Sequence, residues 1–316
     1  MTYSVLKNLI FVLFFLISIS LLAQKESTIL FDGTDLNHWT LGPEGGFEIV
    51  GKELYTGTFK KGDNLFTKKD YANFIFKLQY NLSTVGNSGV LIRCDEEDPW
   101  GTGVEVQLLA PWTPRRDDLH CTGSLYGYAT VLNRPDETPN IWHDLEIRCD
   151  RNLITVLVDG AITTKANIDT IPKMKEKLYK GVIGLQVNHA EVEGQYTKFR
   201  NISIENLDLN MEYVVKGLFE ENQKLRKLAE ENMISFGTDA IGPLAEILSG
   251  NKEVAKNSAK QLLFDLAVTA TDPKLEDQEF SKKMEIELTK AIKDSNKNYA
   301  KNYMKGILKM VVYDGN

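Results

Sequence analysis

The hydrophobic pattern of this chain changes period near residue 206, and this change restricts the folds available to it. From Thr28 to Asn206, short segments alternate apolar and polar residues and are separated by Gly, Asn, Asp and Pro, which is typical of β-strands. After Asn206, apolar residues recur at helical spacing among Ala, Lys and Glu, which is typical of amphipathic helices. The sequence therefore predicts a β domain followed by a helical region.

The β region contains many short strands without helices between them. The clearest strand is predicted at residues 73–82, where alternate apolar side chains share one face, namely Phe74, Phe76, Leu78, Tyr80 and Leu82. Further strands are predicted before Phe66 and at residues 89–94, 103–109, 142–149, 153–158, 181–187 and 198–204. Such a succession favours antiparallel sheets over βαβ units. We expect a mainly β fold, a two-sheet antiparallel jelly-roll sandwich, followed by a small α-helical C-terminal region.

Four helices are predicted after the sandwich, at residues 211–231, 240–248, 254–268 and 282–312. Residues 241–248 and 252–263 have the pattern of two paired helices, as in one HEAT-type repeat. A solenoid generally needs three or more repeats to bury its faces. A small helical bundle is therefore the simpler expectation, and a HEAT-like domain is the alternative.

The N-terminus has the pattern of a secretory signal peptide. Lys7 precedes an uncharged, apolar run from Leu9 to Ala23, which is short for a membrane span of about 20 residues. We expect cleavage after Ala23, leaving a mature chain without a membrane span in the periplasm, at the cell surface or secreted. An uncleaved N-terminal anchor is the alternative. The expected divisions are residues 1–23 for the signal peptide, 24–207 for the jelly roll and 208–316 for the helical domain.

Charge and cysteine content exclude some classes of protein. The net charge of −7 argues against a nucleic-acid partner, because such partners require a basic surface. Cys94, Cys121 and Cys149 are too few for a disulfide framework, so either one bridge with a free thiol or three small buried residues is expected. They form no CxxC motif, so a zinc site built on them has little support.

Strand alternation identifies a candidate polar cluster. Along residues 103–109, alternation places Glu105 and Gln107 on the face opposite the apolar residues of that segment. Along residues 88–94, it places Arg93 opposite the apolar residues. If the two strands are neighbours, Arg93, Glu105 and Gln107 form one cluster. An ordinary solvated strand face with an ion pair is the alternative.

A polar loop and a late strand supply further candidates. The loop at residues 112–128 contains His120 and ends near Tyr126, and loops of this kind form binding mouths in sandwiches. His120 is suited to acid–base chemistry or metal binding, or it is simply exposed to solvent. After residue 184, alternation turns Gln186 and Asn188 away from the apolar residues, and His189 follows at the strand end.

Common catalytic motifs are missing from the sequence. It contains no HExxH, GxSxG, P-loop or paired CxxC motif. Zinc proteases, serine hydrolases and nucleotide-dependent enzymes therefore have no local support.

Six motifs together carry a resemblance to one family. The chain has LFDGTDLNHW at residues 30–39, NSGVLIR at 87–93, VEVQLLA at 104–110, TGSLYG at 122–127, WHDLEI at 142–147 and FRNISI at 199–204. The corresponding motifs of the family are LFDGxxLxxW, NSGIxxR, YEVQxLD, TGxxYG, WNxxEI and FRNIxI. In order and spacing, residues 29–206 resemble the 3-keto-disaccharide hydrolase domain family, formerly domain of unknown function 1080, which has a concanavalin-like jelly-roll fold. The helical tail lies outside the resemblance.

The resemblance implies an enzyme that cleaves 3-keto-glycosides by elimination and hydration, which amounts to hydrolysis. Such a reaction needs an acid, a base and a group that stabilises an enolate. The resemblance implies Glu105 and His120 as the acid–base residues. The implied substrate-binding residues are Arg93, Gln107, Tyr126, Gln186, Asn188 and His189. A divalent metal at the enolate, with Glu105 and His120 or His189 among its ligands, is a further hypothesis.

The sequence departs from the family pattern at several positions. Ala110 replaces the acidic residue of YEVQxLD, Val104 replaces its aromatic residue, and the family's QDHG is Gln-Val-Asn-His at residues 186–189. Loss of a carboxylate makes a non-catalytic carbohydrate-binding module the alternative, with Trp100, Trp112 and Tyr126 stacking on sugar rings. A third hypothesis is a helical tail that docks a protein partner, whose identity the sequence does not indicate.

Overall fold

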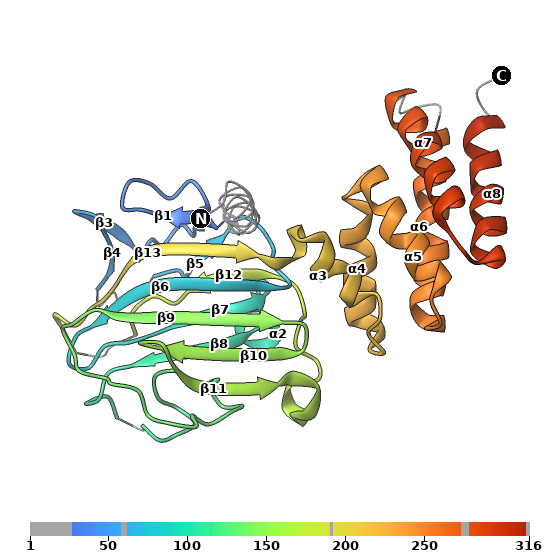
Figure 1. Ribbon diagram of the computed structural model, residues 1–316. Coiled ribbons are helices and arrows are strands. Elements are labelled where there is room, and N and C mark those ends of the chain that lie inside the picture. Colours follow the sequence, from blue (N-terminus) through green and yellow to red (C-terminus); the bar gives the residue numbers. More distant parts are fainter. Residues whose placement is uncertain (1–26, 58–61, 115, 190–191, 273–277, 314–316) are drawn as a thin grey trace, which may run out of the picture.

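The β region forms a sandwich of two antiparallel sheets. The computed structural model describes residues 27–57, 62–114, 116–189, 192–272 and 278–313 (Figure 1), so the expected signal peptide lies outside the described residues. One sheet has the order β11 (Ala161–Asn167), β10 (Leu153–Val158), β9 (His143–Asp150), β6 (Phe74–Leu82), β13 (Thr197–Asn206), β4 (Glu53–Thr56), β3 (Glu48–Val50), and β1 (Thr28–Phe31) also pairs with β13. The other has the order β2 (Trp39–Leu41), β5 (Leu65–Thr67), β12 (Val182–Leu185), β7 (Asn87–Cys94), β8 (Val104–Leu109). The predicted two-sheet jelly-roll sandwich is confirmed.

The two sheets bury their apolar faces against each other. Along β6, Phe74, Phe76 and Tyr80 enter the shared core, whereas Lys77 faces solvent, as the alternation predicts. All three cysteines are buried and unbridged. They therefore behave as small buried residues, which was one of the two alternatives.

Strand β11 was missed because its burial does not follow its hydrophobicity. Thr163 and Thr164 are both buried, and their hydroxyls donate hydrogen bonds to the carbonyl of Gly123 at 3.3 and 2.7 Å. Buried hydroxyls with partners do not produce an apolar–polar alternation. The strand is therefore not recognisable from its sequence.

Consecutive helices pack in pairs in the C-terminal region. The pairs are α3 (Met211–Gly217) with α4 (Gln223–Ile234), α5 (Ile241–Ser249) with α6 (Glu253–Thr271), and α7 (Gln278–Asp294) with α8 (Asn298–Tyr313). The pairs stack, because α6 contacts α4 and α8 while α5 contacts α7, and Figure 1 shows the stack leaving one end of the sandwich. Among the described residues, no helix is long and apolar enough to cross a bilayer.

Two of the four predicted helices are each divided into two helices in the structure. The segment at 211–231 divides into α3 and α4, where the side chain of Asn222 caps α4 by accepting the N–H of Lys224 at 2.9 Å. The segment at 282–312 divides between α7 and α8. The first turn leaves the helical spacing from Leu218 to Leu225 intact, so periodicity does not reveal it. The second turn coincides with a run of polar residues at 293–298, a signal that the predicted helix did not take into account.

Shorter helical turns connect the main elements. Helix α2 (Pro99–Thr102) lies between β7 and β8. The 3-10 turns are η1 (Ile168–Thr170), η2 (Pro172–Met174), η3 (Leu207–Leu209) and η4 (Gly237–Ala240).

Polar contacts join the helices to the β9–β10 hairpin of the sandwich. The Tyr213 hydroxyl donates to Asp150 Oδ1 at 2.6 Å, and the Arg151 guanidinium lies 4.7 Å from the centre of the Tyr213 ring. Arg151 Nε also lies 3.1 Å from a carboxylate oxygen of Glu220. The buried amide of Asn73 bonds Asp208 Oδ1 at 2.8 Å and accepts the N–H of Arg151 at 2.7 Å.

We predict that Asn73→Ala lowers the free energy of unfolding by about 1–3 kcal/mol. The substitution leaves the buried Asp208 carboxylate with one donor fewer, and unpaired buried groups cost this much. Urea denaturation measures the change, with Asn133→Ala on the exposed surface as the control. An unchanged unfolding midpoint in Asn73→Ala would contradict the assigned role of this amide.

Candidate functional site

Glu105 lies on the outer face of the five-stranded sheet, near its edge. The apolar residues of β8 enter the core, so Glu105 points to the opposite face. Residues 122–127 extend the sheet beyond β8, since the N–H of Tyr126 donates to the carbonyl of Glu105 at 2.9 Å and the N–H of Gln107 donates to that of Ser124 at 3.1 Å. Glu105 therefore has neighbouring chain segments on both sides.

The Glu105 carboxyl is enclosed by residues of three elements. Its side chain is only 7% exposed. The indole N–H of Trp100, on α2, donates to Oε2 at 3.3 Å, and Gln186 also hydrogen bonds to the carboxyl. Gly89 of β7 makes room for the carboxyl, because a Cβ at this position would lie 2.4 Å from Glu105 Oε1.

The environment of Glu105 changes its acidity. Burial raises the pKa of Glu105 to about 7, whereas the hydrogen bonds from Trp100 and Gln186 oppose this shift by stabilising the carboxylate. A carboxyl group with a pKa near neutrality takes up and releases a proton easily at neutral pH. Acid–base chemistry requires this property.

Tyr126 and His120 follow Glu105 along the same edge. Leu125 forms a bridge with Val106, so alternation places Tyr126 on the face of Glu105. The His120 ring packs edge-on against the Tyr126 ring, with centroids 4.7 Å apart. His120 Nδ1 also lies 2.8 Å from Asp117 Oδ1. The structure thus brings Glu105, Tyr126 and His120 to one edge of the sheet.

A pocket of about 480 Å³ lies beside Trp100. Its lining includes the rings of Phe66, Trp100 and His189 and three carboxylates, those of Asp63, Glu96 and Glu97. Burial lowers the pKa of His189. Aromatic faces together with oxygen acceptors are suited to the apolar faces and hydroxyl groups of a sugar.

Gln186 has capacity for a further hydrogen bond. Its side chain is buried on the same face, and its backbone N–H donates to Gly89 at 2.9 Å. Its Oε1 atom finds no hydrogen-bond partner among the described residues, and buried polar atoms in this condition are exceptional. Gln107, by contrast, turns back on its own strand, where its Oε1 accepts the N–H of Leu108 at 2.9 Å.

Asn188 joins the two sheets and does not face the pocket. Its Oδ1 accepts the N–H of Asn87 at 3.0 Å, and its own N–H donates to Thr56 Oγ1 at 3.0 Å. Strand β12 ends at Leu185, so the alternation assumed from the sequence does not continue to residue 188. The predicted orientation of Asn188 beside Gln186 is therefore wrong.

Arg93 also lies away from Glu105. The register between β7 and β12 shifts near Arg93, whose φ is +51°. Its guanidinium donates to the carbonyls of Ala72 and Arg151 at 2.7 Å each, and the side chain is 2% exposed. The predicted cluster of Arg93, Glu105 and Gln107 is wrong although β7 and β8 are neighbours, because a bulge redirects the side chains that follow it.

The Ala110 side chain belongs to the core of the sandwich. It is buried within the core cluster, on the opposite side of the chain from Glu105. Its N–H donates to the carbonyl of Gly86 at 2.9 Å. In this chain, the position where the family motif is acidic therefore does not contribute to the face that carries Glu105.

The residues near Glu105 do not match the ligand set of the hypothesised metal site. Among the described residues, no group of three or more His, Cys, Asp or Glu side chains is arranged to hold a metal ion. Glu105 instead contacts Trp100 and Gln186, and His120 contacts Asp117. These contacts do not form the metal site that was hypothesised.

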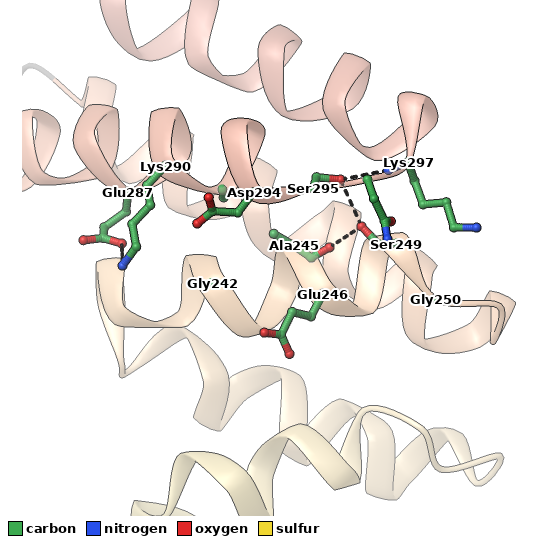
Figure 2. A pocket seen from close by; sticks show the side chains of 12 residues that line it. Gly242, Ala245, Glu246, Ser249, Gly250, Glu287, Lys290, Asp294, Ser295 and Lys297 are labelled. Atoms are coloured by element: carbon green, nitrogen blue, oxygen red, sulfur yellow. Dashed lines mark hydrogen bonds and ion pairs between the residues drawn. The ribbon is translucent and has the colours of Figure 1, made fainter.

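A larger hollow of about 560 Å³ lies between α5 and α7 (Figure 2). Its rim carries both signs of charge, including Glu246, Lys290 and Asp294, and the hydroxyls of Ser249 and Ser295 pair at 3.2 Å. Its lining residues belong to α5, α7 and the turns that follow these helices, away from the sandwich face that carries Glu105. The candidate site is therefore the one on the sandwich.

Sequence reasoning missed the contact between Trp100 and Glu105 and missed Lys177 entirely. The local signal for the first was present, because Asp98 and Pro99 are an N-cap and a first helical residue. A short helix that presents Trp100 could thus be expected. No motif marks Lys177, since its contacts lie 76 and 77 residues away in sequence.

Residues 26–205 match the family model of the 3-keto-alpha-glucoside-1,2-lyase-like domain. Two solved structures of candidate glycosyl hydrolases from Parabacteroides distasonis share the fold. One is 24% identical, with a TM-score of 0.51 over 58% of this chain and 100% of that chain. The other is 21% identical, with a TM-score of 0.50 over 58% and 95%. No curated protein matches this chain.

We predict that wild-type protein loses stability between pH 5 and pH 8 relative to Glu105→Gln. The folded-state pKa of Glu105 is raised, so its contribution is complete below the unfolded-state pKa and is lost as pH rises through about 7. The difference is on the order of 3 kcal/mol. Urea denaturation at several pH values measures it, with Glu231→Gln on the exposed surface as the control. Parallel pH profiles for wild type and Glu105→Gln would contradict the raised pKa.

Proposed function

Because the chain belongs to the family of 3-keto-alpha-glucoside-1,2-lyase-like domains, we propose that its glycosyl-hydrolase-like sandwich cleaves glycosides that carry a ketone at carbon 3 of the sugar. The observation that supports this proposal most directly is the Glu105 carboxyl. It is buried beside an aromatic pocket, and its pKa is raised to about 7. A base of this strength suits removal of a proton next to a ketone.

The reaction begins with proton transfer from carbon 2. A ketone at carbon 3 acidifies this hydrogen, and the Glu105 carboxylate removes it. The electron pair of the C–H bond moves into an enolate whose negative charge rests on the ketone oxygen. The amide nitrogen of Gln186 carries two N–H groups, of which one bonds to the Glu105 carboxyl, and we assign the second as the donor to this oxygen.

The enolate then expels the group at carbon 1. The electron pair of the enolate forms a double bond between carbons 1 and 2 while the ketone at carbon 3 is restored. The bond from carbon 1 to the glycosidic oxygen breaks, its electron pair stays with the leaving oxygen, and this oxygen takes a proton from an acid. His120, oriented by Asp117, is the candidate acid. Addition of water to the double bond completes a net hydrolysis, and release of the unsaturated product makes the reaction a lyase reaction.

Residues of the pocket and Tyr126 of the neighbouring sheet edge bind the sugar. The rings of Trp100 and Tyr126 are 48% and 43% exposed and provide apolar surfaces for a sugar ring. His189 and the pocket carboxylates provide hydrogen-bond partners for hydroxyl groups. Arg93 and Asn188 have no part in the proposed site, since Arg93 points toward the carbonyls of Ala72 and Arg151 and Asn188 binds the N–H of Asn87 between the sheets.

We predict that the purified protein releases the leaving group from a chromogenic 3-keto-glucoside, and that Glu105→Gln loses at least about 100-fold of kcat/KM because the base is removed. His120→Ala is expected to lose the most activity with substrates whose leaving oxygen must be protonated before it departs. The rising limb of kcat/KM with pH is centred near 7, where Glu105 becomes a carboxylate. Product release measured by absorbance checks these outcomes.

Matched controls are Glu231→Gln and His38→Ala, both on exposed surfaces, which are expected to retain full activity. Absence of turnover across several keto-glycosides, together with saturable sugar binding, would favour the carbohydrate-binding module. Full activity in Glu105→Gln would remove Glu105 as the base.

We further propose that the chain is exported and that its signal peptide is cleaved after Ala23. The support is the pattern of Lys7 followed by an apolar run. We predict that protein recovered from the periplasm or the medium begins at Gln24, as read by N-terminal sequencing. Recovery of protein that begins at Met1 in the cytoplasmic fraction would contradict export.

A further inference from the structure

A buried lysine holds the helical turn that carries Trp100. The side chain of Lys177 is 6% exposed. Its ammonium donates to the carbonyls of Trp100 and Gly101 at 2.6 and 2.9 Å. A charged group is rarely this buried unless it is paired with strong partners, so these two hydrogen bonds define the position of the turn.

Other contacts fix the same turn from both of its ends. Asp98 accepts the N–H of Gly101 at 3.0 Å as the N-cap, and the N–H of Leu178 donates to the carbonyl of Thr102 at 3.0 Å. Lys177 and its neighbour therefore attach α2 to the segment that follows η2. The opposite side of α2 presents the indole of Trp100 to Glu105.

Lys177 also contacts the second segment that borders Glu105. Its ammonium lies 5.0 Å from the centre of the Tyr128 ring, a distance typical of a cation–π contact. Tyr128 follows the turn that places Tyr126 opposite Glu105. The one ammonium thus contacts both α2, whose Trp100 indole binds the Glu105 carboxyl, and the segment whose backbone pairs with that of Glu105.

We propose that Lys177 is a positioning residue for Glu105, which acts by holding the Trp100 turn over the carboxyl and so excluding water from it. This inference deepens the proposed function, on which its catalytic meaning rests. The enclosure of Glu105 itself can be measured without any substrate.

The sign of a pKa change separates this role from a direct charge effect. The groups that face Glu105 are Trp100 of α2, Gln186 after β12, Gly89 of β7 and Tyr126 of the 122–127 segment, and none of these four is a cation or a carboxylate. Loss of a nearby cation would raise the pKa of a carboxyl, whereas entry of water would lower it.

The experiment measures the pKa of Glu105 by carboxyl ¹³C NMR on the full chain labelled at Glu. The resonance of Glu105 is identified by its loss in Glu105→Gln. Lys177→Met is expected to lower this pKa by about one unit or more, because water reaches the carboxyl. Lys175→Met, an exposed lysine of the same segment, is the matched control and is expected to leave the pKa unchanged.

A second variant tests the proposal if Lys177→Met fails to fold. Asp98→Ala removes the cap of the same turn from an exposed position and is expected to shift the pKa of Glu105 in the same downward direction. An unchanged or raised pKa in folded Lys177→Met, or in Asp98→Ala, overturns the proposal. Both outcomes are read without turnover, so a failure to cleave keto-glycosides does not affect them.

Discussion

The packing of two apolar sheet faces against each other determines where the side chains of the site point. Because β8 contributes its apolar residues to that core, Glu105 must point outward. The same constraint places Tyr126 beside it through the bridge between Leu125 and Val106. The sandwich is therefore the rigid part of the site, and the outer face of the five-stranded sheet is the surface on which the polar residues are arranged.

The acidity of Glu105 depends on residues that the sheet does not supply. Gly89 gives the carboxyl room within the sheet, but the cover comes from Trp100 on the short helix α2. Desolvation raises the pKa, while the hydrogen bonds from Trp100 and Gln186 limit the rise. The site thus combines the fixed position of Glu105 on β8 with the cover that Trp100 provides from α2, and the acidity of Glu105 depends on both.

Alternation in the sequence was sufficient to predict the sandwich and the outward direction of Glu105, because both follow directly from strand geometry. It failed at Arg93, where a bulge changes the register, and at Asn188, where the strand has already ended. It could not identify Lys177, since that residue binds backbone carbonyls distant in sequence. Bulges, strand ends and long-range contacts to the backbone leave no periodic signal, so they require the folded structure.

The junction between the sandwich and the helices has a consequence for Arg93. Its guanidinium donates to the carbonyl of Arg151, whose own side chain lies against Tyr213 and Glu220 of the helical region. Strand β7 of the five-stranded sheet therefore contacts the β9–β10 hairpin, and this hairpin contacts helix α3. Through the backbone and side chain of Arg151, the end of β7 is therefore tied to the position of the first helices of the stack.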